Sequence, residues 1–200
     1  MIGSSIGQIS PPLYRSQSQD FINQILFTDR LFKRRDDESG LRSINQYIIH
    51  QMIGKGAYAK VKLVHVINNP EQLFAMKVII KETKKRPQMF SKMPPKFQVK
   101  KQEETINKEV AVMKKMNHPN IVQLHEVIDD NSQKKLYMIL EFVKGGPCFR
   151  AKQEPLSEEQ ARSILRDIIA GISYMHKNNI VHHDIKPDNL LFDENGGIKI

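Results

Sequence analysis

Cysteine and tryptophan are almost missing from this sequence of 200 residues, which holds one cysteine, Cys148, and no tryptophan. A single cysteine excludes an internal disulfide and is typical of proteins in reducing compartments, so we expect a cytoplasmic (intracellular) protein. The simplest interpretation of Cys148 itself is a small apolar side chain that fills space in the fold.

Long apolar runs are missing as well. The longest are only a few residues, such as Val78–Ile80, far short of the roughly 20 residues that span a bilayer. The N-terminus shows no basic cluster followed by an apolar stretch, and Ile2 stands where a myristoylated protein carries glycine. We therefore expect no signal peptide and no membrane span. With 26% charged and 7% aromatic residues, a wholly disordered chain is also excluded.

Acidic residues are outnumbered, 22 against 31 Lys and Arg, which gives a formal net charge of +9. Residues 77–115 alone hold twelve Lys or Arg and four Asp or Glu, a net of +8. Such a local cluster is typical of a solvated basic loop or of a surface that docks a partner. Only Phe90 and Phe97 interleave it with aromatic rings, so nucleic-acid binding is the least favoured interpretation.

The first 46 residues are rich in Ser, Gln and Arg, and we expect them to form a mostly flexible N-terminal tail. Within this tail, the spacing of apolar residues over 21–32 predicts a short amphipathic helix. Residues 82–101 carry three prolines among many lysines and are interpreted as a loop or insert without regular structure.

From Tyr47 onward the apolar pattern predicts strands, a helix, more strands and then a segment that begins with a helix. Helices are expected over 103–116 and from Ser157 to about 178, the second opened by a Ser157–Gln160 capping box and carrying a buried apolar stripe. Strands are expected at 47–49, 61–66, 73–79, 121–127 and 136–142. This order predicts an α+β fold: an antiparallel sheet lobe over about 47–142, a hinge near 141–147, and a helical lobe from about 148 to 200.

A glycine-rich segment, Gly54–Val61, lies between two of the expected strands. Glycines at such a turn let backbone N–H groups approach phosphate oxygens. A plain hairpin explains the segment equally well. Because no helix follows and no Gly-Lys-Ser/Thr is present, neither a dinucleotide-binding motif nor a P-loop is favoured.

Two charged residues stand in apolar surroundings. Lys77 lies in the expected strand 73–79, where its charge costs free energy unless it meets an anion. Glu109 lies on the apolar side of the helix expected over 103–116, where it can pair with Lys77. Taken singly, each is also compatible with a solvent-exposed side chain.

The segment 182–189, His-His-Asp-Ile-Lys-Pro-Asp-Asn, carries the most specific pattern. Asp184 can orient an attacking hydroxyl and accept its proton, and Lys186 can meet a moving phosphoryl group. Asn189 can offer its amide oxygen to Mg²⁺. Following the other three motifs in order, this segment predicts phosphoryl transfer.

Together these motifs resemble those of eukaryotic protein kinases over residues 47–200. Lys186 two residues after Asp184 is the serine/threonine-kinase arrangement. Within the family, the sequence is most similar to calcium/calmodulin-dependent protein kinase kinases. This finer resemblance rests on four stretches: 45–47, the insert 82–101, Gly146-Pro147 and 155–162.

The resemblance implies ATP and Mg²⁺ as substrate and cofactor, with Asp184 and Lys186 catalytic and Asn189 holding metal. It implies a gatekeeper at Leu140 and a hinge at 141–143 that bonds adenine through its backbone. The residues implied in ATP binding are Ile53, Gly54, Lys55, Gly56, Ala57, Tyr58, Ala59, Lys60, Val61, Ala75, Lys77, Glu109, Leu140, Glu141, Val143 and Leu191.

The implied function is an ATP-dependent serine/threonine kinase that phosphorylates proteins, including other kinases docked by the insert 82–101. The alternative is a pseudokinase or scaffold that binds nucleotide or partners without catalysis. Lys77, Asp184 and Asn189 together argue against that alternative. Calmodulin would act only through a region beyond the residues given.

Three features depart from the family pattern. Ala59 replaces the third glycine of the loop, a small change that we expect to reduce only loop flexibility. His183 replaces the arginine that gathers an activation-loop phosphate, which predicts weak dependence on such a phosphate. The sequence ends at Ile200, about two residues before the expected Asp-Phe-Gly. We therefore expect a fragment that by itself is inactive and poorly stable.

Overall fold

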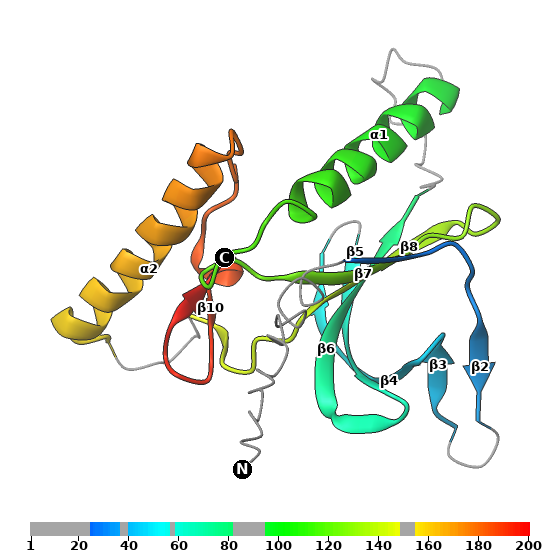
Figure 1. Ribbon diagram of the computed structural model, residues 1–200, viewed down its shortest axis with the longest axis horizontal. Coiled ribbons are helices and arrows are strands. Elements are labelled where there is room, and N and C mark those ends of the chain that lie inside the picture. The colour runs from blue at the N-terminus through cyan, green and yellow to red at the C-terminus, as the bar shows by residue number, and fades with distance from the viewer. Residues whose placement is uncertain (1–24, 37–39, 57–58, 82–94, 149–154) are drawn as a thin grey trace, which may run out of the picture.

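The computed structural model describes residues 25–36, 40–56, 59–81, 95–148 and 155–200. A curled sheet with one helix, α1, over its face forms the larger part of the molecule (Figure 1). A second helix, α2, and a small second sheet form the rest. This arrangement agrees with the expected antiparallel sheet lobe followed by the beginning of a helical lobe.

The large sheet has eight strands within the described residues, in the order β1-β7-β8-β6-β5-β4-β3-β2. All neighbours are antiparallel except β1 and β7, which run parallel. All five strands expected from Tyr47 onward are present, with somewhat different ends. The bounds are β1 Leu26–Thr28, β2 Lys33–Arg35, β3 Arg42–Ile44, β4 Tyr47–Lys55, β5 Ala59–Val66, β6 Asn69–Ile80, β7 Leu124–Ile128 and β8 Lys135–Glu141.

Strand β6 separates two apolar clusters, because successive side chains of a strand point to opposite faces. Phe74, Met76 and Val78 pack into one cluster, together with Tyr47 and other residues. The alternate residues of β6 face the other way, where Ala75 and Ile79 pack with α1. Lys77 follows the same alternation and is therefore carried to the side that α1 covers.

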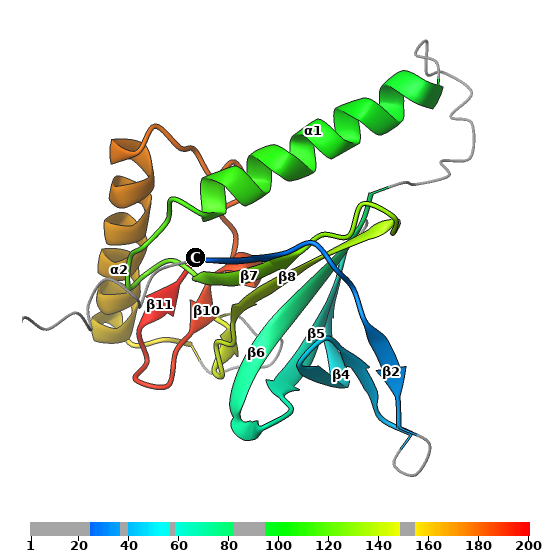
Figure 2. The same ribbon diagram turned by 45° about the vertical axis from the view of Figure 1, so that its right-hand side comes forward.

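Helix α1 (Pro95–Met113) lies across this second face (Figure 2). Ile106 and Val110, four residues apart, are buried in the cluster beneath it. The prediction of an irregular segment through residue 101 is wrong from Pro95 on. Proline inside a sequence pattern indicates a break in a helix. At the first helical position, however, an N–H would have no acceptor within the helix, and the fixed φ of proline is already helical.

The prediction of a helix over 21–32 is wrong where the structure describes this segment, and the prediction of a tail is wrong at 26–28, 33–35 and 42–44. These residues instead form β1, β2 and β3, which add strands to both ends of the large sheet. The reason is tertiary: the exposed edges of β7 and β4 supply backbone partners, and this pairing overrides a weak local helical pattern. Residues 1–24 lie outside the described ranges.

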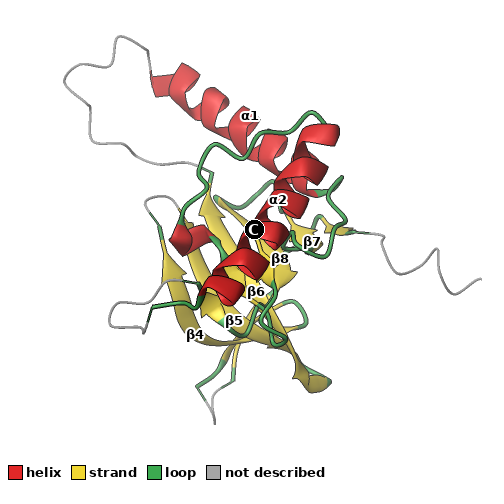
Figure 3. Ribbon diagram, turned by 90° about the vertical axis from the view of Figure 1, so that its left-hand side faces the viewer, coloured by secondary structure: helices red, strands yellow, loops and turns green. Residues whose placement is uncertain are grey.

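Helix α2 (Glu158–Lys177) begins at the predicted capping box, with Ser157 and Gln160 bonded reciprocally. Its apolar stripe is only partly buried: Gly171 and Met175 are covered, whereas Leu165 and Ile169 are each 55% exposed. Figure 3 shows α2 standing outside the large sheet, with α1 behind it. The stripe predicted to be buried is therefore largely uncovered by the described residues.

The second sheet joins the middle of the chain to its end. It has the order β11-β10-β9, with β9 Gly146–Pro147, β10 Leu191–Phe192 and β11 Ile198–Lys199. A short 3-10 helix, η1 (Pro187–Asn189), precedes β10. Neither α1 nor α2 is long and apolar enough to cross a lipid bilayer.

Candidate active site

The glycine-rich segment forms the hairpin between β4 and β5. Gly54 pairs with Val61, and the Gly56 N–H donates to the Ala59 carbonyl at 2.8 Å. A Cβ at Gly54 would meet that of Val61 at 3.4 Å, an ordinary contact, and among the described residues one at Gly56 would meet the Ala59 oxygen at 3.7 Å. Neither glycine has a positive φ. Packing and backbone conformation therefore do not demand glycine here, which favours a role toward a ligand.

The two residues at the tip of this hairpin, Ala57 and Tyr58, lie outside the described residues. Of the remaining loop positions implied in ATP binding, Lys55 and Lys60 pair across the hairpin and both side chains are exposed. Two positive charges thus flank the opening of the hairpin. Such charges favour an anionic ligand near the loop backbone.

Lys77 and Glu109 form the predicted ion pair. Lys77 lies in β6 between the neighbouring strands β5 and β8, and Glu109 lies on α1. The Lys77 Nζ is 2.5 Å from Glu109 Oε1, and the two side chains are 28% and 39% exposed. The carboxylate compensates the ammonium for its partial loss of water, so Lys77 is held in one place with N–H donors left for a second anion.

Apolar residues implied in adenine binding are distributed between two environments. Ala75 and Leu140 lie opposite each other on β6 and β8, each 9% exposed, and Val61 packs against their cluster. Leu191 lies in the second sheet, on β10, and Ile53 is 42% exposed on β4. The structure thus brings Ala75, Leu140 and Val61 together in one apolar cluster of the sheet lobe. Leu191 belongs to the second lobe.

The hinge is held by contacts that the sequence did not predict. Glu141 Oε1 lies 2.8 Å from the Nζ of Lys199, and the Glu141 N–H donates to the carbonyl of Gln123. Val143 is buried, and its carbonyl accepts from the Gly146 N–H at 3.3 Å. The Glu141 side chain therefore links the hinge to β11. No sequence pattern pointed to Lys199, because its partner lies 58 positions earlier.

The second group of site residues follows α2. Asp184 Oδ2 is 2.9 Å from Lys186 Nζ and also accepts from Asn189 Nδ2 at 2.9 Å. Asn189 Nδ2 donates a further bond, at 2.8 Å, to the Asp184 carbonyl. Pro187 starts the 3-10 turn that brings Asn189 back toward Asp184. Lys186 and Asn189 thus converge on the carboxylate of Asp184.

Two titrating groups in this loop are shifted. The hydrogen bond from Lys186, and then that from Asn189, lowers the pKa of Asp184 below its ordinary value. Burial lowers the pKa of His182, whose Nδ1 accepts the Asp184 N–H at 3.2 Å. Asp184 is thus a carboxylate near neutral pH, and a neutral His182 positions its backbone. Sequence reasoning missed this role of His182, although its place two residues before Asp184 was a signal.

Asn189 has one suitable atom for a cation. Its amide nitrogen makes both hydrogen bonds, so the amide oxygen points away from Asp184 as a free acceptor. Among the described residues no group of three His, Cys, Asp or Glu side chains could hold a metal ion. Mg²⁺ needs few protein ligands when phosphates and water complete its shell, and Asn189 fits that requirement.

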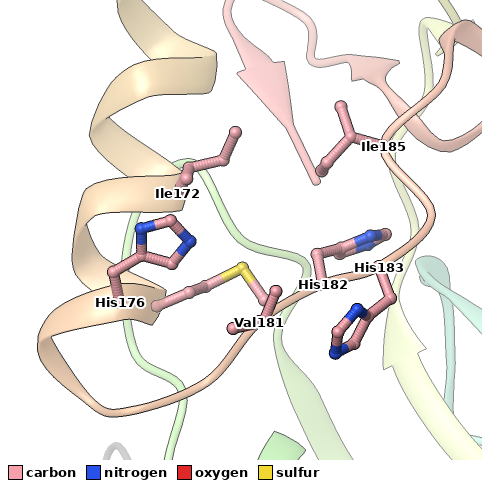
Figure 4. Close-up of a pocket in the computed structure, with 7 residues that line it drawn as sticks. Ile172, His176, Val181, His182, His183 and Ile185 are labelled. Atoms are coloured by element: carbon pink, nitrogen blue, oxygen red, sulfur yellow. The ribbon is translucent and has the colours of Figure 1, made fainter.

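A cavity of about 240 Å³ lies behind the loop that carries Asp184. Figure 4 shows Ile172 and His176 of α2 facing it from one side and Val181, His182, His183 and Ile185 from the other. Asp184, Lys186 and Asn189 do not line this cavity.

His183 has a positive φ of 64°, a strained conformation for a residue with a side chain, so the chain turns sharply just before Asp184.

The two groups of residues lie in different lobes. The hairpin, Lys77 and Glu109 belong to the large sheet and α1, and Asp184, Lys186 and Asn189 belong to the loop after α2. Among the described residues, no hydrogen bond or ion pair joins the two groups. A ligand that contacts both would lie between the lobes, at the hinge.

A two-lobed fold with these two groups defines a protein kinase. A sequence profile of the protein kinase domain matches residues 47–200, and the chain belongs to that family. Its relatives are serine/threonine kinases. The kinase ssp1 of Schizosaccharomyces pombe is 39% identical over 175 residues, covering 86% of this chain and 26% of that protein.

Two further relatives match over similar lengths. The calcium/calmodulin-dependent protein kinase kinase of Caenorhabditis elegans is 38% identical over 78% of this chain and 31% of its own length. The serine/threonine-protein kinase GRIK1 of Arabidopsis thaliana is 38% identical over 84% of this chain and 41% of its own length. The chain therefore spans about a quarter to two fifths of these relatives.

Proposed function

We propose that the protein containing this chain transfers the γ-phosphoryl group of Mg-ATP to serine or threonine hydroxyls of other proteins. The observation that carries the proposal is the convergence of Lys186 and Asn189 on the carboxylate of Asp184. This arrangement leaves Asp184 ionised and fixed, which an acceptor of a hydroxyl proton requires. The fold itself does not demand glycine at 54 and 56, so these two glycines support a role of the hairpin in binding a nucleotide.

Each residue then has a distinct task. Lys77, held by Glu109, donates to the phosphates of ATP and fixes their position. Asp184 accepts a hydrogen bond from the substrate hydroxyl and receives its proton as the oxygen attacks phosphorus. Lys186 offers positive charge beside the transferred group, where negative charge gathers in the transition state. Asn189 would hold Mg²⁺, which when bound neutralises phosphate charge.

We further propose that the substrates include other protein kinases. Support comes from the names of two relatives. One is the kinase kinase of Caenorhabditis elegans, and the other is the SNF1-activating kinase 1 of Saccharomyces cerevisiae, which is 34% identical over 188 residues. The basic insert at 82–101 is the proposed docking region. Residues 82–94 of it lie outside the described residues, and 95–101 begin α1. We also propose an intracellular location, where ATP is available to the enzyme.

The proposal is tested by assaying the complete protein with γ-labelled Mg-ATP and a panel of protein substrates, among them inactive variants of other protein kinases. We expect label on serine or threonine that depends on Mg²⁺ and is abolished by chelation. Nucleotide binding without any transfer to protein would contradict the proposal and favour a pseudokinase.

His183 yields a separate expectation. An imidazole lacks the fork of paired donors with which arginine holds a phosphate, so the unaltered protein should keep its activity, within about twofold, after phosphatase treatment. The His183→Arg variant should gain dependence on phosphate. A clear loss of activity on phosphatase treatment of the unaltered protein would show this expectation to be wrong.

A further inference from the structure

Residues 25–31, here called the N-terminal strap, lie outside the matched kinase domain yet form part of its sheet. The strap runs alongside β7, below α1, in two views (Figures 1 and 2). It precedes the matched region by only 16 residues in sequence. The segment that the family profile does not cover thus reaches the helix that carries Glu109.

Backbone bonds attach the strap to the sheet. Strand β1 pairs in parallel with β7, from Leu26 opposite Glu126 to Thr28 opposite Ile128. The Asp129 N–H donates to the Thr28 carbonyl at 2.9 Å, and the Leu31 N–H donates to Asp130 Oδ2 at 3.2 Å. The strap therefore covers an edge of the sheet that would otherwise expose unpaired backbone groups.

A buried carboxylate strengthens this attachment. Glu126 is 1% exposed and accepts hydrogen bonds from Thr28 Oγ1 at 2.5 Å, Gln46 Nε2 at 2.8 Å and Tyr47 Oη at 2.6 Å. A buried carboxylate depends strongly on its donors, because an unmet acceptor has lost its water without compensation. Removal of the strap would take one of the three donors from Glu126.

The strap also contacts α1. Ile25 packs against the apolar cluster that contains Ile106 and Val110 of the helix. The ring of Phe27 lies under the Nζ of Lys114, just beyond the end of α1, at 4.4 Å from its centroid. Over 104–113, where α1 side chains are described, only Ile106 and Val110 are buried. Over this described part of the helix, Ile106 and Val110 provide the buried contacts with the sheet. Ile25 of the strap lies in the same cluster, and Phe27 lies beside the end of the helix.

We propose that the strap holds α1 in the position where Glu109 pairs with Lys77, and that Thr28 and Phe27 are positioning residues for phosphoryl transfer. The proposal rests on the proposed function, because it assigns regulation of that same site. Detachment of the strap would leave α1 free to move and the pair free to separate. Whatever releases or fastens residues 25–31 would then regulate the kinase.

Substitution in the strap tests this proposal in the complete protein. Thr28→Asp places a second carboxylate against the buried Glu126, and Phe27→Ala removes the ring under Lys114. We expect Thr28→Asp to lower the transfer rate about tenfold, roughly the effect of a lost buried hydrogen bond. Phe27→Ala should lower it about two- to fivefold, the usual effect of losing a cation–π contact at an exposed site. Thr28→Ser keeps the hydroxyl and should restore the rate. Leu26→Ala, a matched change at an exposed position of the same strand, should have no effect.

Hydrogen exchange supplies a readout independent of activity. In Thr28→Asp and Phe27→Ala, we expect faster exchange of the α1 amides over 104–113, with α2 unchanged. The proposal is overturned if α1 exchanges as before, whether or not β1 does, or if exchange rises equally in every element. If the unaltered protein transfers no phosphate, the proposed function fails, while the exchange of α1 still decides whether the strap holds the helix.

Discussion

The Asp184→Asn variant of the complete protein is expected to transfer phosphate roughly a thousandfold more slowly than the unaltered protein, the usual range for loss of a general base. Asparagine has the same shape but cannot take up the proton of the attacking hydroxyl. It also loses the charge that pairs with Lys186 at 2.9 Å. Affinity for ATP should change by less than about twofold, since the carboxylate acts on the hydroxyl side of the reaction.

Asp188→Asn is the matched control for this change. Asp188 is exposed, lies four residues further along the same loop, and loses the same charge on substitution. Steady-state kinetics of both variants, with ATP affinity measured by titration, should separate them by about three orders of magnitude in kcat. An Asp184→Asn protein that retained the original rate would remove Asp184 from the chemistry.

Lys77→Met should reduce transfer by at least about a hundredfold, as the loss of one charged donor to a transition state does in other enzymes. Methionine preserves the apolar stem in β6 but removes the ammonium that donates to phosphate. It also leaves Glu109, 39% exposed, without its cation. Lys135→Met, at an exposed position of β8, removes the same charge away from the site and should leave the rate unchanged.

A double-variant cycle distinguishes positioning from direct action. If Glu109 acts only by holding Lys77, Glu109→Gln should lower the rate less than Lys77→Met does. The double variant should then be no slower than Lys77→Met alone, because residues that act as a unit are not additive. Two losses that multiplied fully would show that Glu109 has a role of its own.

The sequence was a reliable guide wherever a local pattern decided the structure. The strand period at 73–79, the capping box at Ser157 and the order of motifs from Gly54 to Asn189 each reflect chemistry within a few residues. They predicted the sheet lobe, the start of α2 and the pairing of Lys77 with Glu109. The exception was Pro95, whose effect depends on whether it falls inside a helix or at its first position.

Contacts between segments that lie far apart in the sequence could not be predicted from it. The helix expected over 21–32 is in part a strand, because β7, about a hundred positions later, offers backbone partners that no local period reveals. The bond between Glu141 and Lys199 was missed for the same reason. The shared donors of Glu126 come from two segments, and only the fold brings them together.

The sequence by itself therefore determined the family and the order of the elements from Tyr47 onward, and it supplied the roles proposed for Lys77, Asp184, Lys186 and Asn189, since these depend on residue type and short spacing. Only the tertiary structure decided that residues 26–28, 33–35 and 42–44 complete the sheet and that residues 25–31 lie beside α1. The open edge of a sheet can be paired and covered by any segment that reaches it. That choice depends on the path of the whole chain rather than on any local pattern.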